Sequence, residues 1–254
     1  MKKELTQSQV WEIAGNALHD EQYRTNYSKA LAFVLKDKNL KILDTAGGTG
    51  FPTFDLYKLG FTNLSVTDGN ETYAKELQEK FKSEGMEISA YHSSWQELGN
   101  KISEKFDVIV NADNSFVYMD GWMGGETPEK LENIIPRIQM CLKSFFEATK
   151  DNGLVVIGLG KHYVPSYKGS DRTFDSERNG EQYHTIWKST FDWGKRINTW
   201  TTRVESDLSE GEVVRKSYLI TKEELVEQMK VAGFKNVYIL IPDDTRDDLI
   251  IGIK

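Results

Sequence analysis

The chain has 254 residues, a formal net charge of −7 and a pI near 5.3. Its length is enough for one α/β domain with an insertion, and its acidic balance argues against a nucleic-acid or anionic-membrane partner. The single cysteine, Cys141, supports neither a disulfide framework nor a metal site, so we expect no metal. No apolar run approaches the roughly 20 residues of a membrane helix, and the first residues, Met1 to Glu4, show no apolar signal region. We therefore expect a soluble, cytoplasmic protein.

Helical and strand patterns alternate along most of the chain. Periodicity and capping pairs, such as Thr221 with Glu224, predict the helices. They fall at residues 6–18, 23–36, 53–59, 71–84, 128–149 and 221–232. Short apolar runs predict strands at residues 41–45, 64–67, 88–91, 107–111, 154–158, 236–241 and 247–253. This alternation is typical of a parallel sheet with helices on both faces.

The last two predicted strands are joined by residues 242–246 alone. Such a link is too short for a parallel crossover, so the two strands should pair antiparallel. The predicted fold class is α/β, with a Rossmann-like, seven-stranded, mostly parallel sheet that ends in an antiparallel hairpin.

Residues 161–215 interrupt the alternation and are rich in tyrosine, tryptophan and polar residues. Residues 190–217 favour antiparallel strands over helix. We expect residues 161–215 to form an insertion, or lid, over the carboxyl ends of the main strands, where such sheets bind ligands. Residues 1–160 and 216–254 would then form the main domain.

The strand at 41–45 runs directly into the small-residue turn from Asp44 to Gly50, and a second strand ends at Asp68, 18 residues after Gly50. Small residues let a ligand lie against the backbone, and the carboxylate of Asp68 can accept hydrogen bonds from ribose hydroxyls. The turn either holds the amino-acid part of S-adenosylmethionine or is an ordinary strand-to-helix turn. We favour the first, because Asp68 and the terminal hairpin accompany it. No Gly-Lys-Ser/Thr follows, which excludes a P-loop, and the antiparallel final strand suits a methyltransferase better than an NAD enzyme.

Polar residues also follow the third and fourth strands. Trp95 can stack on adenine while Ser94 bonds its amino edge, or Trp95 can simply pack on the helix after the first turn. The cluster from Asn111 to Phe116 can orient a nucleophile, or it can only form a turn. The four histidines have no metal-ligand spacing, and we expect each to be structural or exposed.

These motifs resemble the class I S-adenosylmethionine-dependent methyltransferases, and within them the glycine and sarcosine N-methyltransferases. The turn from Asp44 to Gly50 is similar to their Asp-Val-Ala-Cys-Gly-Thr-Gly, and Asn114-Ser115-Phe116 matches their Gly-Asn-Ser-Phe, with Asp113 in place of glycine. Shorter matches are Val10-Trp11, Arg24-Thr25, Lys161-His162-Tyr163 and Arg215-Lys216-Ser217-Tyr218.

The resemblance implies roles for individual residues. Arg24 would bind the methionine carboxylate, Asp68 the ribose, and Asn114 the acceptor amine. Lys161 stands where the family has an arginine for the acceptor's carboxylate, and lysine offers only a point charge. The predicted cofactor-binding set is Arg24, Asp44, Ala46, Gly47, Gly48, Gly50, Asp68, Gly69, Asn70, Ser94, Trp95 and Asn111. The predicted catalytic and acceptor-side set is Asn114, Lys161, Tyr183 and Tyr218.

The sequence thus predicts S-adenosylmethionine-dependent methyl transfer to a small amine or amino acid of the glycine or sarcosine kind. Two alternatives stay open: cyclisation of the cofactor with release of methylthioadenosine, and a non-catalytic module that binds the cofactor. Some members of the family are oligomers, so a homo-oligomer is also open.

Overall fold

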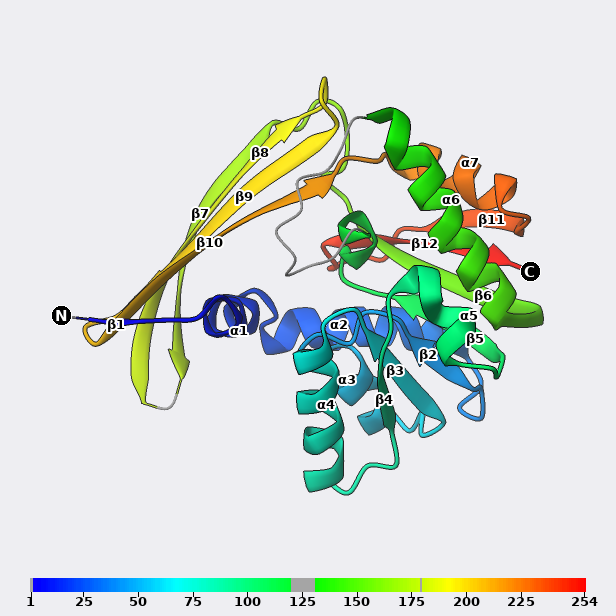
Figure 1. Ribbon diagram of the computed structural model, residues 1–254, viewed down its shortest axis with the longest axis horizontal. Helices are drawn as coiled ribbons and strands as arrows, with labels where there is room; N and C mark the ends of the chain where they lie inside the picture. The colour runs from blue at the N-terminus through cyan, green and yellow to red at the C-terminus, as the bar shows by residue number, and fades with distance from the viewer. Residues whose placement is uncertain (1, 120–130, 179) are drawn as a thin grey trace.

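The computed structural model describes residues 2–119, 131–178 and 180–254 (Figure 1). Its helices are α1 (Gln7–Leu18), α2 (Glu21–Leu35), α3 (Thr53–Lys58), α4 (Glu71–Ser83), α5 (Leu98–Lys101), α6 (Leu131–Ala148) and α7 (Lys222–Val231). The strands of the main sheet are β2 (Ile42–Asp44), β3 (Leu64–Asp68), β4 (Ser89–His92), β5 (Phe106–Asn111), β6 (Thr149–Gly160), β11 (Lys235–Leu240) and β12 (Asp247–Ile253). All seven were predicted. The helix predicted at 128–149 also forms, although residues 128–130 lie outside the described part of the chain.

The main sheet has seven strands in the order β11-β12-β6-β5-β2-β3-β4. The strands from β6 to β4 pair in parallel, whereas β12 is antiparallel to both β6 and β11. The predicted fold class, including its antiparallel terminal hairpin, is therefore confirmed.

Helices cover both faces of this sheet. One apolar cluster joins the sheet to α6 and α7, and a second joins it to α2, α3 and α4. Helix α4 shows the cause, because its buried residues Tyr73, Leu77 and Phe81 recur every four positions and form one apolar stripe. Among the described residues, no helix is long and apolar enough to span a bilayer.

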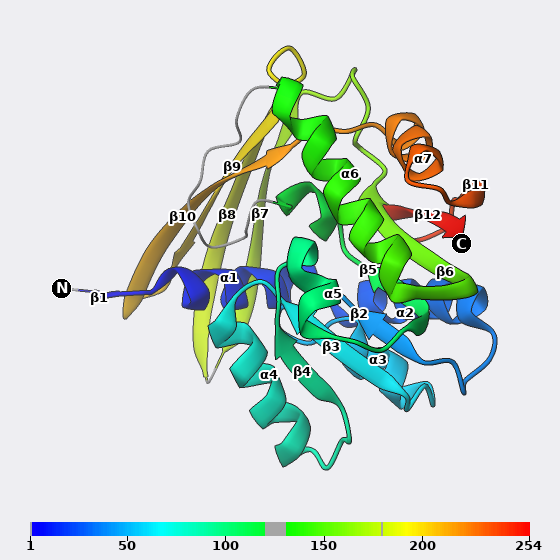
Figure 2. The same cartoon turned by 45° about the vertical axis from the view of Figure 1, so that its right-hand side comes forward.

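A second sheet stands beside the first (Figures 1 and 2). Its order is β1-β10-β9-β8-β7. The strands are β1 (Lys3–Glu4), β7 (Gly169–Arg178), β8 (Glu181–Asp192), β9 (Ile197–Glu205) and β10 (Ser209–Tyr218). The strands expected within residues 190–217 are confirmed, but β7, most of β8 and β1 were not predicted.

Helix α1 packs against the second sheet. Its buried residues Val10, Ile13 and Ala14 meet Trp200 and Val213 in a third apolar cluster. The N-terminal segment thus belongs structurally to the second sheet as well as leading into α2.

Strand direction brings the polar residues together at one edge of the main sheet. Asp44, Asp68 and Asn111 end the parallel strands β2, β3 and β5. Because β12 runs the opposite way, its first residue, Asp247, pairs with the last residue of β6, Gly160. The antiparallel strand therefore delivers an additional carboxylate to the same edge.

Candidate functional site

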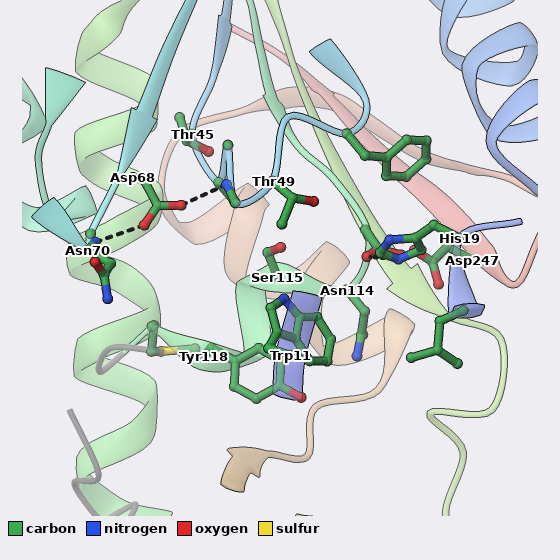
Figure 3. Close-up of a pocket in the computed structure, with 18 of the residues that line it drawn as sticks. Trp11, His19, Thr45, Thr49, Asp68, Asn70, Asn114, Ser115, Tyr118 and Asp247 are labelled. Atoms are coloured by element: carbon green, nitrogen blue, oxygen red, sulfur yellow. Dashed lines mark hydrogen bonds and ion pairs between the residues drawn. The ribbon is translucent and has the colours of Figure 1, made fainter. Parts of the chain in front are cut away.

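A cavity of about 840 Å³ lies between the carboxyl ends of the main sheet and the second sheet. Its walls come from the turn after β2, the ends of β3 and β5, the start of β12, helix α1 and strands β7 and β8 (Figure 3). This volume lies within the range of pockets that hold whole small molecules. The predicted site residues that line it are Ala46, Gly47, Gly48, Asp68, Gly69, Asn70, Ser94, Trp95 and Asn114.

Asp44 shapes the turn from beneath and does not line the cavity. Its Oδ1 accepts from the Ala46 backbone N–H at 3.0 Å and its Oδ2 from the Thr53 hydroxyl at 2.7 Å. Burial raises the pKa of Asp44 from 3.8 to about 6, and these two hydrogen bonds only partly oppose that shift.

The raised pKa of Asp44 predicts how the free energy of unfolding changes with pH. Between pH 3.8 and about 6 the folded protein holds a proton on Asp44 that the unfolded chain releases. The Asp44 contribution to the free energy of unfolding should therefore fall by roughly 3 kcal/mol as the pH rises through that window, then level off. Asp44→Asn should remove this part of the decline, as measured by denaturant unfolding at about pH 4 and about pH 7. Equal declines in the two proteins would contradict the prediction.

The glycines of the turn serve different ends. A Cβ at Gly47 would meet Val66 Cγ1 at 2.3 Å, so tight packing on β3 requires that glycine. Gly48 lines the cavity with φ +49°, and a Cβ there would have only Ala46 O, at 3.9 Å, within contact distance. Its bare backbone therefore faces the open space. Gly50 does not line the cavity and packs on Phe54.

Asp68 links the turn to helix α4. Its Oδ2 accepts from Gly48 N at 2.8 Å and its Oδ1 from Asn70 N at 2.7 Å (Figure 3). The Asn70 side chain in turn caps α4 by accepting from Thr72 N and Tyr73 N. Burial raises the pKa of Asp68, although the two backbone N–H groups oppose that shift.

Trp95 is 9% exposed and lines the cavity with Ser94. Its Nε1 donates to the Thr45 carbonyl at 2.6 Å, and its ring stacks on Phe116 with 5.8 Å between centroids. The Ser94 hydroxyl donates to Glu97 at 3.1 Å. Phe145 of α6 packs edge-on against the same ring at 5.9 Å between centroids, so Trp95 is held by the turn after β2, by Phe116 and by α6.

Asn111, the last residue of β5, and Asn114, three residues later, have different places in the site. Asn111 lies beneath the cavity floor and donates to the Thr45 hydroxyl at 3.0 Å. Asn114 lines the cavity in the left-handed conformation, at φ +55°. Its amide donates to the Tyr163 hydroxyl at 3.0 Å and accepts from Gly160 N at 3.1 Å.

Besides Asp44, Gly50 and Asn111, four predicted site residues are not among those that line the cavity. The Arg24 guanidinium pairs with Asp55 at 2.8 Å, and Lys161 Nζ donates to the Pro242 carbonyl. Tyr183 is buried in the α1 cluster and Tyr218 in the α6 cluster. Their roles in binding stay predictions.

Several lining residues were not predicted as site residues. His19 Nε2 lies 2.7 Å from Asp113 Oδ2, and the Tyr23 hydroxyl donates to Asp113 Oδ1 at 2.8 Å. Asp247 lines the same region (Figure 3). His162 also lines the cavity, and burial, followed by the Arg172 charge, lowers its pKa to about 4. Aromatic rings from helices, from loops and from β8 complete the wall: Trp11, Tyr23, Phe51, Tyr73, Trp95, Tyr118, Tyr163, Tyr167, Trp187 and Phe191.

Comparisons with known proteins identify the fold. No protein-family model matches the chain. A glycine/sarcosine N-methyltransferase of Aphanothece halophytica is 31% identical over 86 residues, which is 34% of this chain and 32% of that enzyme. CalS10, an amino pentose methyltransferase from Micromonospora echinaspora, superposes with a TM-score of 0.72 at 13% identity over 96% of each chain. The chain has the fold of S-adenosylmethionine-dependent methyltransferases. DesVI of Streptomyces venezuelae superposes with a TM-score of 0.76 at 14% identity, over 98% of each chain.

The resemblance seen in the sequence agrees with the match to the glycine/sarcosine N-methyltransferase. In that match the chain spans only about a third of the length of the relative. His19, Asp113 and Asp247 line one region of the cavity. Only Asp113 had a signal in the sequence, since it stands where the resembling family has glycine. His19 and Asp247 had none, because only the folded chain brings them to Asp113.

Proposed function

We propose that the protein is an enzyme that binds S-adenosylmethionine at the carboxyl ends of β2, β3 and β4 and transfers its methyl group to the amine of a small molecule. The observation that carries this proposal is the arrangement of Asp68 beside the bare turn at Gly48, both lining the cavity.

The described residues fit the nucleoside of the cofactor. Each carboxylate oxygen of Asp68 accepts one backbone N–H, and an ionised carboxylate has about four acceptor sites, so two remain for ribose hydroxyls. Gly48 leaves room for a chain to lie against the backbone. Ser94 and Trp95 would hold the adenine, although the Phe116 stack leaves only the other face of Trp95.

The far side of the cavity would receive the acceptor. Strands β7 and β8 supply Ser170, Trp187 and Ser189 there, and Asn114 lies between the two sides. Aromatic rings mixed with hydroxyls suit a compact polar molecule with some apolar surface. Two acceptor classes follow from the similar proteins: an amino acid of the glycine or sarcosine kind, and an amino sugar.

When bound, S-adenosylmethionine supplies a methyl group on a positively charged sulfur. The protein's own part is to hold the acceptor nitrogen in line with that carbon, to exclude water, and to support the positive charge that moves to nitrogen. Asn114 is held by Tyr163 and Gly160 and therefore presents a fixed amide at the acceptor side.

The test is incubation with labelled S-adenosylmethionine and, in separate reactions, glycine, sarcosine, glucosamine or a simple thiol, with a no-acceptor control. Mass spectrometry should show S-adenosylhomocysteine and a methylated amine. Methylthioadenosine in the no-acceptor control would instead indicate cyclisation. Tight cofactor binding without turnover of any acceptor would indicate a binding module.

A further inference from the structure

Asp247 is a buried carboxyl group at the cavity with an oxygen that lacks a hydrogen-bond partner. The residue is 3% exposed and lines the cavity, and its Oδ2 makes no hydrogen bond within the described part of the chain. Buried polar atoms are nearly always paired, so this oxygen needs an explanation. A ligand group that donates a hydrogen bond is the simplest one.

Gly158 shows how closely Asp113 and Asp247 approach. A single point, the position of a Cβ on Gly158, lies 3.1 Å from Asp113 N and 3.2 Å from Asp247 Oδ2. Asp113 and Asp247 both line the cavity, as does Asn114. Figure 3 labels Asn114 and Asp247. The Asp247 carboxyl group therefore lies next to the Asp113 backbone, and the negative charge of Asp113 acts on it.

Their surroundings differ. Asp113 pairs with His19 and accepts from Tyr23, so its pKa is lowered even though burial alone would raise it. For Asp247, burial and then the negative charge of Asp113 raise the pKa well above 3.8. Two neighbouring carboxyl groups pushed apart in this way can divide a proton-transfer task between them.

We propose that Asp247 takes the proton from the acceptor's ammonium group, and that Asp113, held by His19 and Tyr23, faces the positive charge which the nitrogen gains during methyl transfer. This inference rests on the proposed function, because it concerns the amine that the enzyme would methylate.

The step balances. When an ammonium group arrives beside Asp247, its positive charge favours the ionised form of the side chain. The Asp247 carboxyl group therefore releases its proton to solvent and becomes a carboxylate. The carboxylate then takes one proton from the ammonium nitrogen, which leaves a neutral amine with a lone pair. That nitrogen forms a bond to the methyl carbon as the carbon–sulfur bond breaks, and the electron pair of the broken bond stays on sulfur. The positive charge is now on nitrogen, opposite Asp113.

The arrangement also narrows the substrate class. Two carboxyl groups attract a cationic amine and repel an adjacent carboxylate. An amine on a body without an acidic group, such as an amino sugar, suits this subsite better than glycine does. The family position that would grip an acceptor carboxylate holds Lys161, whose Nζ is engaged by Pro242 outside the cavity lining.

The titration of Asp247 depends on several facing groups. Tyr23 and Tyr27 approach it from α2, Tyr163 lies after β6, and Arg246 and Asp248 flank it in sequence. Asp248 is itself paired with Lys222. The negative charge of Asp113 raises the pKa of Asp247, whereas the positive charge of Arg246 opposes that shift.

The test compares the wild-type protein with Asp247→Asn, using glucosamine as the acceptor. The variant keeps the shape and removes a buried acid, so it should fold. We expect kcat at about pH 7 to fall roughly 100-fold, the deficit to shrink towards about pH 9 as free amine becomes abundant, and cofactor affinity to stay unchanged. Asp243→Asn, an exposed acid in the same hairpin loop, is the matched control and should behave as wild type.

A second variant separates the two roles. Asp113→Asn should lower kcat and move the acidic limb of the rate profile to lower pH, because Asp247 loses its negative neighbour. An unaltered profile in both variants, or a loss in Asp247→Asn that is the same at every pH, would overturn the inference while leaving methyl transfer itself established.

Binding is measured apart from turnover. In the presence of S-adenosylhomocysteine, calorimetry should show that the wild-type protein binds glucosamine at least about 10-fold more tightly than glucose, and that Asp247→Asn loses this preference. If no amine is methylated but the preference is present, the proposed function fails and the amine subsite stands. If glucosamine and glucose bind alike, the subsite fails.

Discussion

Asp68→Ala should weaken S-adenosylmethionine binding by about 100-fold or more. The substitution removes the carboxylate that we expect to accept both ribose hydroxyls, and hydrogen bonds to a charged group contribute about 1.5–3 kcal/mol each. It also frees Gly48 N and Asn70 N, so the turn and the start of α4 lose their common anchor. Isothermal calorimetry with the purified protein measures the effect directly.

Two further variants make this result specific. Asp68→Asn keeps one acceptor oxygen and should bind with an intermediate affinity. Glu79→Ala removes an exposed acid from α4 and should leave the affinity unchanged. Wild-type affinity in Asp68→Ala would remove Asp68 from the ribose site.

Gly50→Ala should destabilise the protein by roughly 3 kcal/mol, the sum of two costs. Gly50 has φ +106°, where an alanine is strained, and the new Cβ would lie 2.2 Å from Phe54 Cε2. Because Phe54 belongs to the core under α3, the clash cannot be relieved into solvent. Thermal unfolding should show a lower Tm by about 5–10 °C, and cofactor affinity should fall with it.

Gly99→Ala is the matched control. Gly99 lies in α5 and a Cβ there meets no atom of the described residues within 4 Å, so stability should be unchanged or slightly improved. A Gly50→Ala protein as stable as Gly99→Ala would show that the turn is free to move, contrary to the packing seen here.

The central strands of the main sheet could be predicted from the sequence because they contain short apolar runs bounded by turns. The run Leu64–Asp68 is buried throughout, so its composition alone sets it apart. Strand β7 could not be found in that way. Most of its residues are exposed or half-buried. It forms by pairing with the neighbouring strand β8 rather than through its own apolar content.

The candidate site likewise has a part that could be predicted from the sequence and a part that could not. The turn after β2 and Asp68 are close in sequence and their geometry follows from a strand–turn–helix pattern. His19, Asp113 and Asp247 come from three distant segments, and only the sheet order places them side by side. For Arg24 and Lys161 the resemblance supplied a role but not the contacts of the side chain, and their roles in binding stay predictions. Asp55 and Pro242 engage these side chains.

The reversed direction of β12 has a consequence for engineering the acceptor side. Asp247 is held in place by main-chain pairing with Gly160 and by the Thr245 hydroxyl, which donates to its carbonyl at 2.7 Å. The exposed loop positions Asp243 and Asp244 should therefore accept a change of length or sequence, even though the loop borders the cavity. New side chains carried there could reach a larger acceptor while the carboxyl group stays registered to the sheet. The loop of this hairpin can therefore be redesigned while Asp247, the proposed proton acceptor, keeps its position.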